Sequence, residues 1–134
     1  MKRRLLLILI ACFVGLSGNS PAKSDRVLAA HENERAVVEF KDQVKLLGVF
    51  LKGEYLIIHD HEKMARGEDC TYIYRLKDGK QGELVVSFHC TPQPRPLAES
   101  FRLKTSRRFT QGIIPEVTEI QFGGSREAHL VPSS

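Results

Sequence analysis

The sequence predicts an all-β fold: a small antiparallel β-sandwich or barrel of six to seven short strands, held by one disulfide. Short runs rich in β-branched and aromatic residues alternate with turn residues throughout residues 36–124. Outside the apolar N-terminus, only residues 24–35 have a composition that suits a helix. The chain has 134 residues, of which 42% are hydrophobic. This length and composition fit one domain with its own core.

The first 22 residues have the composition of a secretory signal peptide. Basic residues at 2–4 precede an apolar run at 5–16, and small or polar residues follow at 17–22. The apolar run is shorter than the roughly 20 residues that a membrane-spanning helix needs. We therefore expect cleavage after Ala22 and export of the mature chain to the periplasm or the extracellular space, without a transmembrane segment.

A second interpretation of the N-terminus is a bacterial lipoprotein signal. Residues 9–12 end in Cys12 and resemble a lipobox, in which Cys12 would carry the lipid. The apolar run before Cys12 is short, and apolar residues continue after it, where a polar tether is expected. Both features favour the signal peptide.

The charge of the mature chain argues against a nucleic-acid partner. The whole chain has 20 Lys and Arg against 16 Asp and Glu. Cleavage after Ala22 removes three basic residues and no acidic ones, which leaves 17 against 16 and a net charge of +1. Because binding to a phosphate backbone needs many basic contacts, we expect no nucleic-acid binding.

Along the mature chain, short strands and turns follow one another. Seven segments have the composition of strands: 36–41, 44–52, 54–60, 70–76, 84–90, 101–104 and 117–122. Gly48 suggests a bulge inside the second segment, and Gly53 suggests a turn after it. The prolines of 91–96 restrict that segment to an extended loop or a sheet edge. We expect a mobile or helical segment at 23–35, a β domain at 36–124 and a polar C-terminal tail at 125–134.

Two cysteines of the mature chain lie on one predicted hairpin. Residues 77–83 have a turn composition, and a hairpin symmetric about residue 80 places Cys70 opposite Cys90. The same register pairs Tyr72 with Phe88, Tyr74 with Val86 and Leu76 with Leu84. Opposed residues of an antiparallel pair have Cα atoms about 4.5 to 5.5 Å apart, within the range that a disulfide spans. In an exported domain a Cys70–Cys90 disulfide is therefore the expected state, with metal ligation by the two cysteines as the alternative.

The histidines suggest a metal site on the other face of the same strands. His59 and His61 form a His-x-His pair, whose Cα atoms on a strand would lie about 7 Å apart on one face. If the strand of His59 pairs with the next, His59 lies opposite Thr71, and the hairpin register then places Thr71 opposite His89. Three imidazoles at His59, His61 and His89 could bind Cu(II) or Zn(II). The alternative is a set of solvated histidines without a metal.

Several runs of the sequence resemble an uncharacterised group of small exported proteins from soil bacteria. These runs are 52–55 (Lys-Gly-Glu-Tyr), His59 with Asp60, the stretch 63–74 around Cys70, 86–92 around Cys90, and 121–124 (Gln-Phe-Gly-Gly). The likeness covers residues 44–124. It implies export and a β-rich domain, and it implies no activity, because the group has none assigned.

The sequence contains no motif of a known catalytic class. It has no His-Glu-x-x-His, Cys-x-x-Cys, Gly-x-Ser-x-Gly or phosphate-binding glycine loop. We therefore expect an exported, non-catalytic binding or envelope-associated module whose partner is a protein or a small ligand. The alternative function is binding of copper or zinc by the histidine face, and a hydrolytic enzyme comes third.

Overall fold

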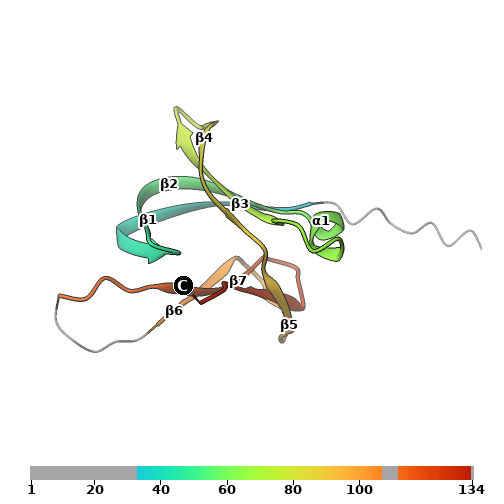
Figure 1. Cartoon of the computed structure of the whole chain (residues 1–134). Coiled ribbons are helices and arrows are strands. Elements are labelled where there is room, and N and C mark those ends of the chain that lie inside the picture. Colours follow the sequence, from blue (N-terminus) through green and yellow to red (C-terminus); the bar gives the residue numbers. More distant parts are fainter. Residues whose placement is uncertain (1–32, 107–111, 134) are drawn as a thin grey trace, which may run out of the picture.

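The computed structural model describes residues 33–106 and 112–133, which form two antiparallel sheets of four strands each. The first sheet has the order β1 (Glu34–Leu46), β2 (Val49–His59), β3 (Thr71–Lys77) and β4 (Lys80–Phe88). The second has the order β5 (Thr91–Pro94), β8 (Glu127–Leu130), β7 (Val117–Gln121) and β6 (Arg102–Thr105). The two sheets lie one above the other (Figure 1). The predicted all-β fold is confirmed as a two-sheet arrangement with eight strands rather than six or seven. The predicted signal peptide, Cys12 and residues 23–32 lie outside the described residues.

The first hairpin differs from the expected strand pattern because its turn and its bulge exchange places. Leu47 and Gly48 form the turn between β1 and β2, with φ angles of 48° and 83°. Two consecutive left-handed residues are typical of the tight turns that fit the twist of a hairpin. Gly53, expected as a turn, lies inside β2 opposite Phe40, and the pairing shifts between Phe40 and Val44. Its φ of 94° suits a glycine at such an irregularity.

The second hairpin has a different register from the symmetric one expected. Its turn consists of Asp78 and Gly79, with φ angles of 52° and 70°. Two irregularities in the β3–β4 pairing follow the turn, and Thr71 faces Phe88. The expected pairs Tyr72 with Phe88, Tyr74 with Val86, and Leu76 with Leu84 therefore do not form. A shift of one residue reverses the faces of a strand, and so Thr71 is buried in the core while Tyr72 is only half-buried.

The second sheet contains one strand that the sequence does not suggest. β6 and β7 pair as the last two predicted strands, and the proline-containing β5 lies at a sheet edge, as expected. Residues 125–134, expected as a polar tail, contain β8, which pairs with β5 on one side and β7 on the other. Gly123, Gly124 and the polar residues after them have the composition of a loop, so the sequence does not predict this short strand. Its Ala128 and His129 are buried.

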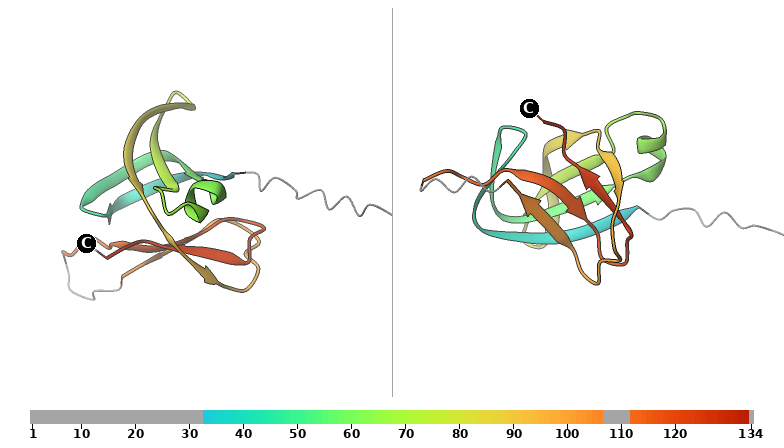
Figure 2. Two further views of the ribbon diagram at one scale, coloured as in Figure 1. Left: turned by 45° about the vertical axis from the view of Figure 1, so that its right-hand side comes forward. Right: turned by 90° about the horizontal axis from the view of Figure 1, so that it is seen from below.

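The core lies between the two sheets, and one short helix lies at its end. The buried apolar residues of the core are Phe40, Val44, Leu46, Leu51, Tyr55, Ile57, Ile73, Phe88, Val117, Ile120 and Phe122. α1 (His61–Ala65) follows β2 directly, and the Asp60 side chain caps it by accepting a hydrogen bond from the Lys63 backbone N–H. Figure 2 shows α1 at one end of the sandwich, beside the space between the sheets. No helix in the described part of the chain is long and apolar enough to cross a membrane.

Candidate metal centre

The His59 and His61 side chains lie together, but a strand end and a helix start bring them there. His59 is the last residue of β2 and lies opposite Thr71, as predicted. It is fully buried on the same side as Cys90, although it was expected on the face away from the cysteines. Asp60 leaves the strand and caps α1, so that His61 becomes the first helical residue. The two rings are perpendicular, with centroids 4.6 Å apart. The two predicted histidines are therefore close together, but they do not share one face of a strand as expected.

His89, the third histidine predicted, lies apart from this pair. The β3–β4 register places Phe88 rather than His89 opposite Thr71. His89 is exposed, and its Nδ1 lies 2.7 Å from the Glu68 carbonyl oxygen. Among the described residues, the groups whose ligand atoms converge do not include His89. The shift in the hairpin register explains the difference, because it places Thr71, and with it His59, on the core side of the sheet. His89 stays on the outer face, where the whole histidine site was expected.

His129 of β8 joins His59 instead. His129 is buried, and its ring stacks on His59 with centroids 3.7 Å apart and an angle of 29° between the planes. The two residues come from different sheets, so the stack forms across the core. Sequence reasoning missed His129 because it falls in the expected tail. The only sequence feature that suggests burial of His129 is its apolar neighbours Ala128, Leu130 and Val131.

One carboxylate oxygen connects the three imidazoles. Glu34, the first residue of β1, pairs with His59 across the strand ladder. Its Oε2 lies 2.9 Å from His129 Nε2, 3.2 Å from His59 Nδ1 and 3.4 Å from His61 Nε2. Burial raises the pKa of the Glu34 carboxyl, but the contacts with His129 and His59 lower it by more, so that the net pKa lies well below its usual value. Glu34 is therefore a carboxylate at neutral pH.

Three sulfur atoms lie next to this group. Cys90 Sγ is 3.5 Å from His129 Nδ1, 3.7 Å from Met64 Sδ and 3.1 Å from Cys70 Sγ. The predicted disulfide is not confirmed, because a sulfur–sulfur bond is about 2.05 Å long and both cysteines are free thiols. Cys70 directly precedes β3 and Cys90 lies between β4 and β5, which brings the two thiols into contact. The Cys70 backbone N–H donates a hydrogen bond to the Phe88 carbonyl oxygen, so Cys70 does not face Cys90 in the ladder. Burial, followed by the neighbouring Cys70 thiol, raises the pKa of Cys90 to about 12.

The buried ring of His59 has no hydrogen bond. Neither its Nδ1 nor its Nε2 has a hydrogen-bond partner among the described residues, although Nδ1 lies at ion-pair distance from Glu34. Leaving a buried polar group unsatisfied costs about 1 to 3 kcal/mol. Such a group in a folded core calls for an explanation. Here the ring lies beside His129 and Cys90, whose side chains can also bind a metal.

The ligand atoms form two overlapping groups of three. The inner trio is His59, Cys90 and His129, all buried; the outer trio is Glu34, His59 and His61. Within each trio the ligand atoms lie within 4.8 Å of one another. Nitrogen and sulfur bound tetrahedrally to one zinc ion lie about 3.5 Å apart, from metal–ligand lengths of about 2.0 and 2.3 Å. The 3.5 Å between His129 Nδ1 and Cys90 Sγ matches this separation.

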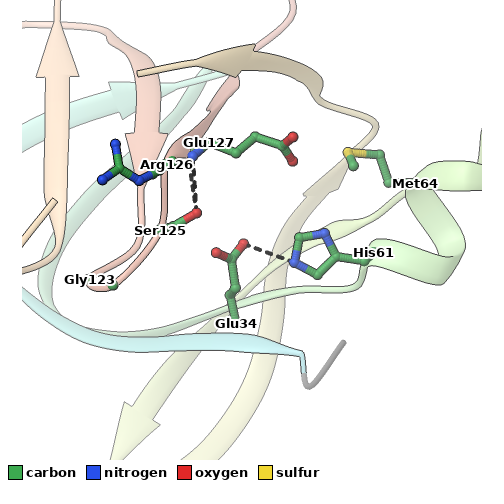
Figure 3. A pocket seen from close by; sticks show the side chains of 8 residues that line it. Glu34, His61, Met64, Gly123, Ser125, Arg126 and Glu127 are labelled. Carbon is green, nitrogen blue, oxygen red and sulfur yellow. Dashed lines mark hydrogen bonds and ion pairs between the residues drawn. The ribbon is translucent and has the colours of Figure 1, made fainter. Parts of the chain in front are cut away.

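An open cavity adjoins the outer trio. Its volume is about 650 Å³, and its lining includes Glu34, His61, Met64, Gly124, Ser125 and Glu127. Figure 3 shows the Glu34 carboxylate facing the His61 ring at this cavity. The inner trio is therefore enclosed, while the outer trio borders a space that is open to solvent.

Comparison of the chain with protein-family models, with curated proteins and with solved structures finds no match. The chemistry of the two trios is accordingly the basis for a function.

Proposed function

We propose that this protein binds one transition-metal ion, copper or zinc, at the inner trio of His59, Cys90 and His129. The observation that carries the proposal is the buried His59 ring without hydrogen bonds, stacked on His129 beside the Cys90 thiol. Imidazole nitrogen and thiolate sulfur are common ligands of both metals.

The position of Glu34 supports the proposal. A histidine that binds a metal through one ring nitrogen commonly donates a hydrogen bond from the other to a carboxylate. His129 has this arrangement, because its Nε2 lies 2.9 Å from Glu34 while its Nδ1 faces Cys90. When Nε2–H donates to Glu34, the lone pair of Nδ1 points toward the metal position. Glu34 would thus orient the ring before the metal arrives.

The sulfur-rich surroundings favour copper in its reduced state. Met64 Sδ lies 3.7 Å from Cys90 Sγ, which places a thioether beside the proposed metal position. Thioether and thiolate sulfur favour Cu(I), whereas zinc sites in proteins use thiolate, imidazole and carboxylate. Two imidazoles, one thiolate and a weak methionine sulfur is also the ligand set of copper centres that transfer electrons.

Cys70 gives the proposed site two chemical states. With both thiols reduced, Cys90 can bind a metal as a thiolate. The predicted Cys70–Cys90 disulfide belongs to the oxidised protein, in which Cys90 has no free thiolate to offer. Export, which the N-terminal sequence predicts and which we include in the proposal, would expose the site to metals outside the cytoplasm and also to oxidising conditions that favour the disulfide. The metal-bound and disulfide states would then compete for Cys90.

Calorimetric titration of the reduced mature chain, with Zn(II) and with Cu(I) under anaerobic conditions, tests the proposal. We expect one equivalent to bind, and we expect Cys90→Ser and His129→Gln each to weaken binding at least 100-fold. His89→Gln is the matched control and should bind as the unmodified chain does, since His89 belongs to neither trio. Circular dichroism checks that each variant is folded. An absence of binding in the reduced chain would contradict the proposal.

A further inference from the structure

The inner trio is closed to solvent, so a metal ion must reach it through other residues. The side chain of His59 has 0% exposure and that of His129 1%, and Cys90 is 0% exposed. A hydrated metal ion cannot enter such a site without first losing water molecules. The loss of water is fastest when protein ligands replace the water molecules one at a time.

The outer trio lies between the inner trio and the cavity. Its His61 and Glu34 side chains are 23% and 16% exposed, and both line the cavity of about 650 Å³. A carboxylate oxygen and an imidazole on one zinc-like ion lie about 3.4 Å apart. The separations of 3.4 Å from His61 Nε2 and 3.2 Å from His59 Nδ1 to Glu34 Oε2 agree with this value.

We propose that the outer trio of Glu34, His59 and His61 is a second, transient metal site, through which a divalent ion passes from the cavity to the inner trio. The inference depends on the proposed function of the inner trio. His59 belongs to both trios and can stay bound while the other two ligands are exchanged.

The two trios differ in chemical character, and this difference gives the transfer a direction. The outer trio offers one carboxylate and two imidazoles, which suit a partly hydrated divalent ion at the protein surface. The inner trio replaces the carboxylate and His61 by Cys90 and His129 and is fully buried. Binding there replaces the Cys90 S–H bond by a sulfur–metal bond, and solvent in the cavity takes up the released proton. The sulfur–metal bond makes the inner trio the more stable position for copper, zinc and cobalt.

Stopped-flow absorption with Co(II) as the metal alone can follow this transfer in the reduced mature chain. Only the inner trio contains sulfur, so absorption by charge transfer from thiolate to Co(II) reports arrival at Cys90. We expect His61→Gln to slow the appearance of this absorption at least tenfold, with a final affinity within twofold of the unmodified chain. His89→Gln, the matched control, should change neither the rate nor the affinity.

Three outcomes separate the two proposals. An unchanged rate in His61→Gln overturns the outer site. An affinity that falls as far as the rate also overturns it, since His61 would then bind the metal in the final state. If the unmodified chain shows no thiolate absorption at all, the proposed function itself fails. Metal-free melting temperatures of the variants show whether a changed rate comes from altered folding.

Discussion

His59 and His129 stack face to face in the core, with ring centroids 3.7 Å apart, although one belongs to β2 and the other to β8 of the opposite sheet. A pair of buried imidazoles adds little to a hydrophobic core, because each ring carries polar nitrogens that need partners. Glu34 and Cys90 lie within reach of His129, while His59 Nδ1 lies 3.2 Å from Glu34 and the His59 ring makes no hydrogen bond within the described part of the chain. The ring nitrogens of this pair are therefore the basis of the proposed metal site.

Glu34→Gln should weaken zinc binding about 10- to 100-fold, the usual effect of removing the carboxylate behind a metal-binding histidine. Glutamine keeps the size of the side chain but loses the charge that holds the His129 ring. The matched control is Glu127→Gln, because Glu127 lines the same cavity and belongs to neither trio. Calorimetric titration with Zn(II) measures both variants. Equal affinities for the two variants would show that Glu34 does not support the site.

Met64→Leu should separate copper from zinc. The change removes the sulfur that lies 3.7 Å from Cys90 Sγ and keeps an apolar side chain of similar volume. We expect the affinity for Cu(I) to fall at least tenfold and the affinity for Zn(II) to stay within twofold. Competition with a chromophoric Cu(I) chelator and a Zn(II) indicator gives the two values. A parallel loss for both metals would mean that Met64 acts through packing and not as a ligand.

Oxidation should close the metal site. Oxidised glutathione can convert the two thiols, whose Sγ atoms lie 3.1 Å apart, into a disulfide while it is reduced to two molecules of glutathione. We expect the oxidised chain to bind Zn(II) at least 100-fold more weakly than the reduced chain. Thiol labelling and mass spectrometry confirm the oxidation state of the sample.

Cys70→Ser is the control for this experiment. Serine cannot form the disulfide, so the variant should keep its affinity after the same treatment, provided that mass spectrometry shows no glutathione adduct on Cys90. Tight binding by a fully oxidised, unmodified chain would remove Cys90 from the proposed ligands.

A charged cluster away from the proposed metal centre, Glu119 with Arg95 and Lys104, should make the free energy of unfolding depend on pH. Glu119 on β7 is 7% exposed in its side chain and contacts Arg95 at 2.7 Å and Lys104 at 3.0 Å. The hydrogen bond with Arg95 is the largest cause that lowers the pKa of Glu119, and Lys104 lowers it further. Burial raises the pKa, and the net value is about 2. Because the folded-state pKa is lower than the usual value of 4.5, the pair stabilises the fold fully above that value. This stabilisation is lost as the pH falls toward about 2.

Glu119→Gln should therefore lower the free energy of unfolding by about 2 kcal/mol at pH 7, as expected for charge-assisted hydrogen bonds. The difference from the unmodified chain should shrink steadily below pH 4.5. Urea denaturation at a series of pH values measures it. Glu83→Gln is the control, because its contact with Arg75 is long at 3.4 Å and its side chain is 73% exposed, so we expect less than about 0.5 kcal/mol. A loss for Glu119→Gln that does not change with pH would contradict the assignment.

The part of the site that follows local patterns could be predicted from the sequence. The His-x-His spacing identifies His59 and His61, and antiparallel pairing of 54–60 with 70–76 across the short connection predicts His59 opposite Thr71. The contact between the two cysteines was also predictable, because any register near the symmetric one brings residues 70 and 90 close together. Whether that contact is a bond depends on a shift of about one ångström, which no sequence pattern determines.

The remaining ligands depend on register and on pairing between distant segments. The β3–β4 hairpin turns at Asp78 and Gly79 and then contains two irregularities, so that Thr71 faces Phe88, one residue from the symmetric register. Thr71 and His59 therefore face the core, and His89 does not join them. His129 depends on β8, a strand of four residues that exists because β5 and β7 flank it. Glu34 is the first residue of its strand, where charged residues are common and give no signal. Tertiary pairing, rather than local composition, assembles both trios.

X-ray absorption spectroscopy of the reduced mature chain loaded with one equivalent of Zn(II) tests the central claim most directly. It measures which atoms surround the metal and at what distance. We predict one sulfur neighbour at about 2.3 Å and at least two nitrogen neighbours at about 2.0 Å, with the sulfur signal lost in Cys90→Ser. A metal surrounded only by nitrogen and oxygen in the unmodified chain would contradict the assignment of the inner trio.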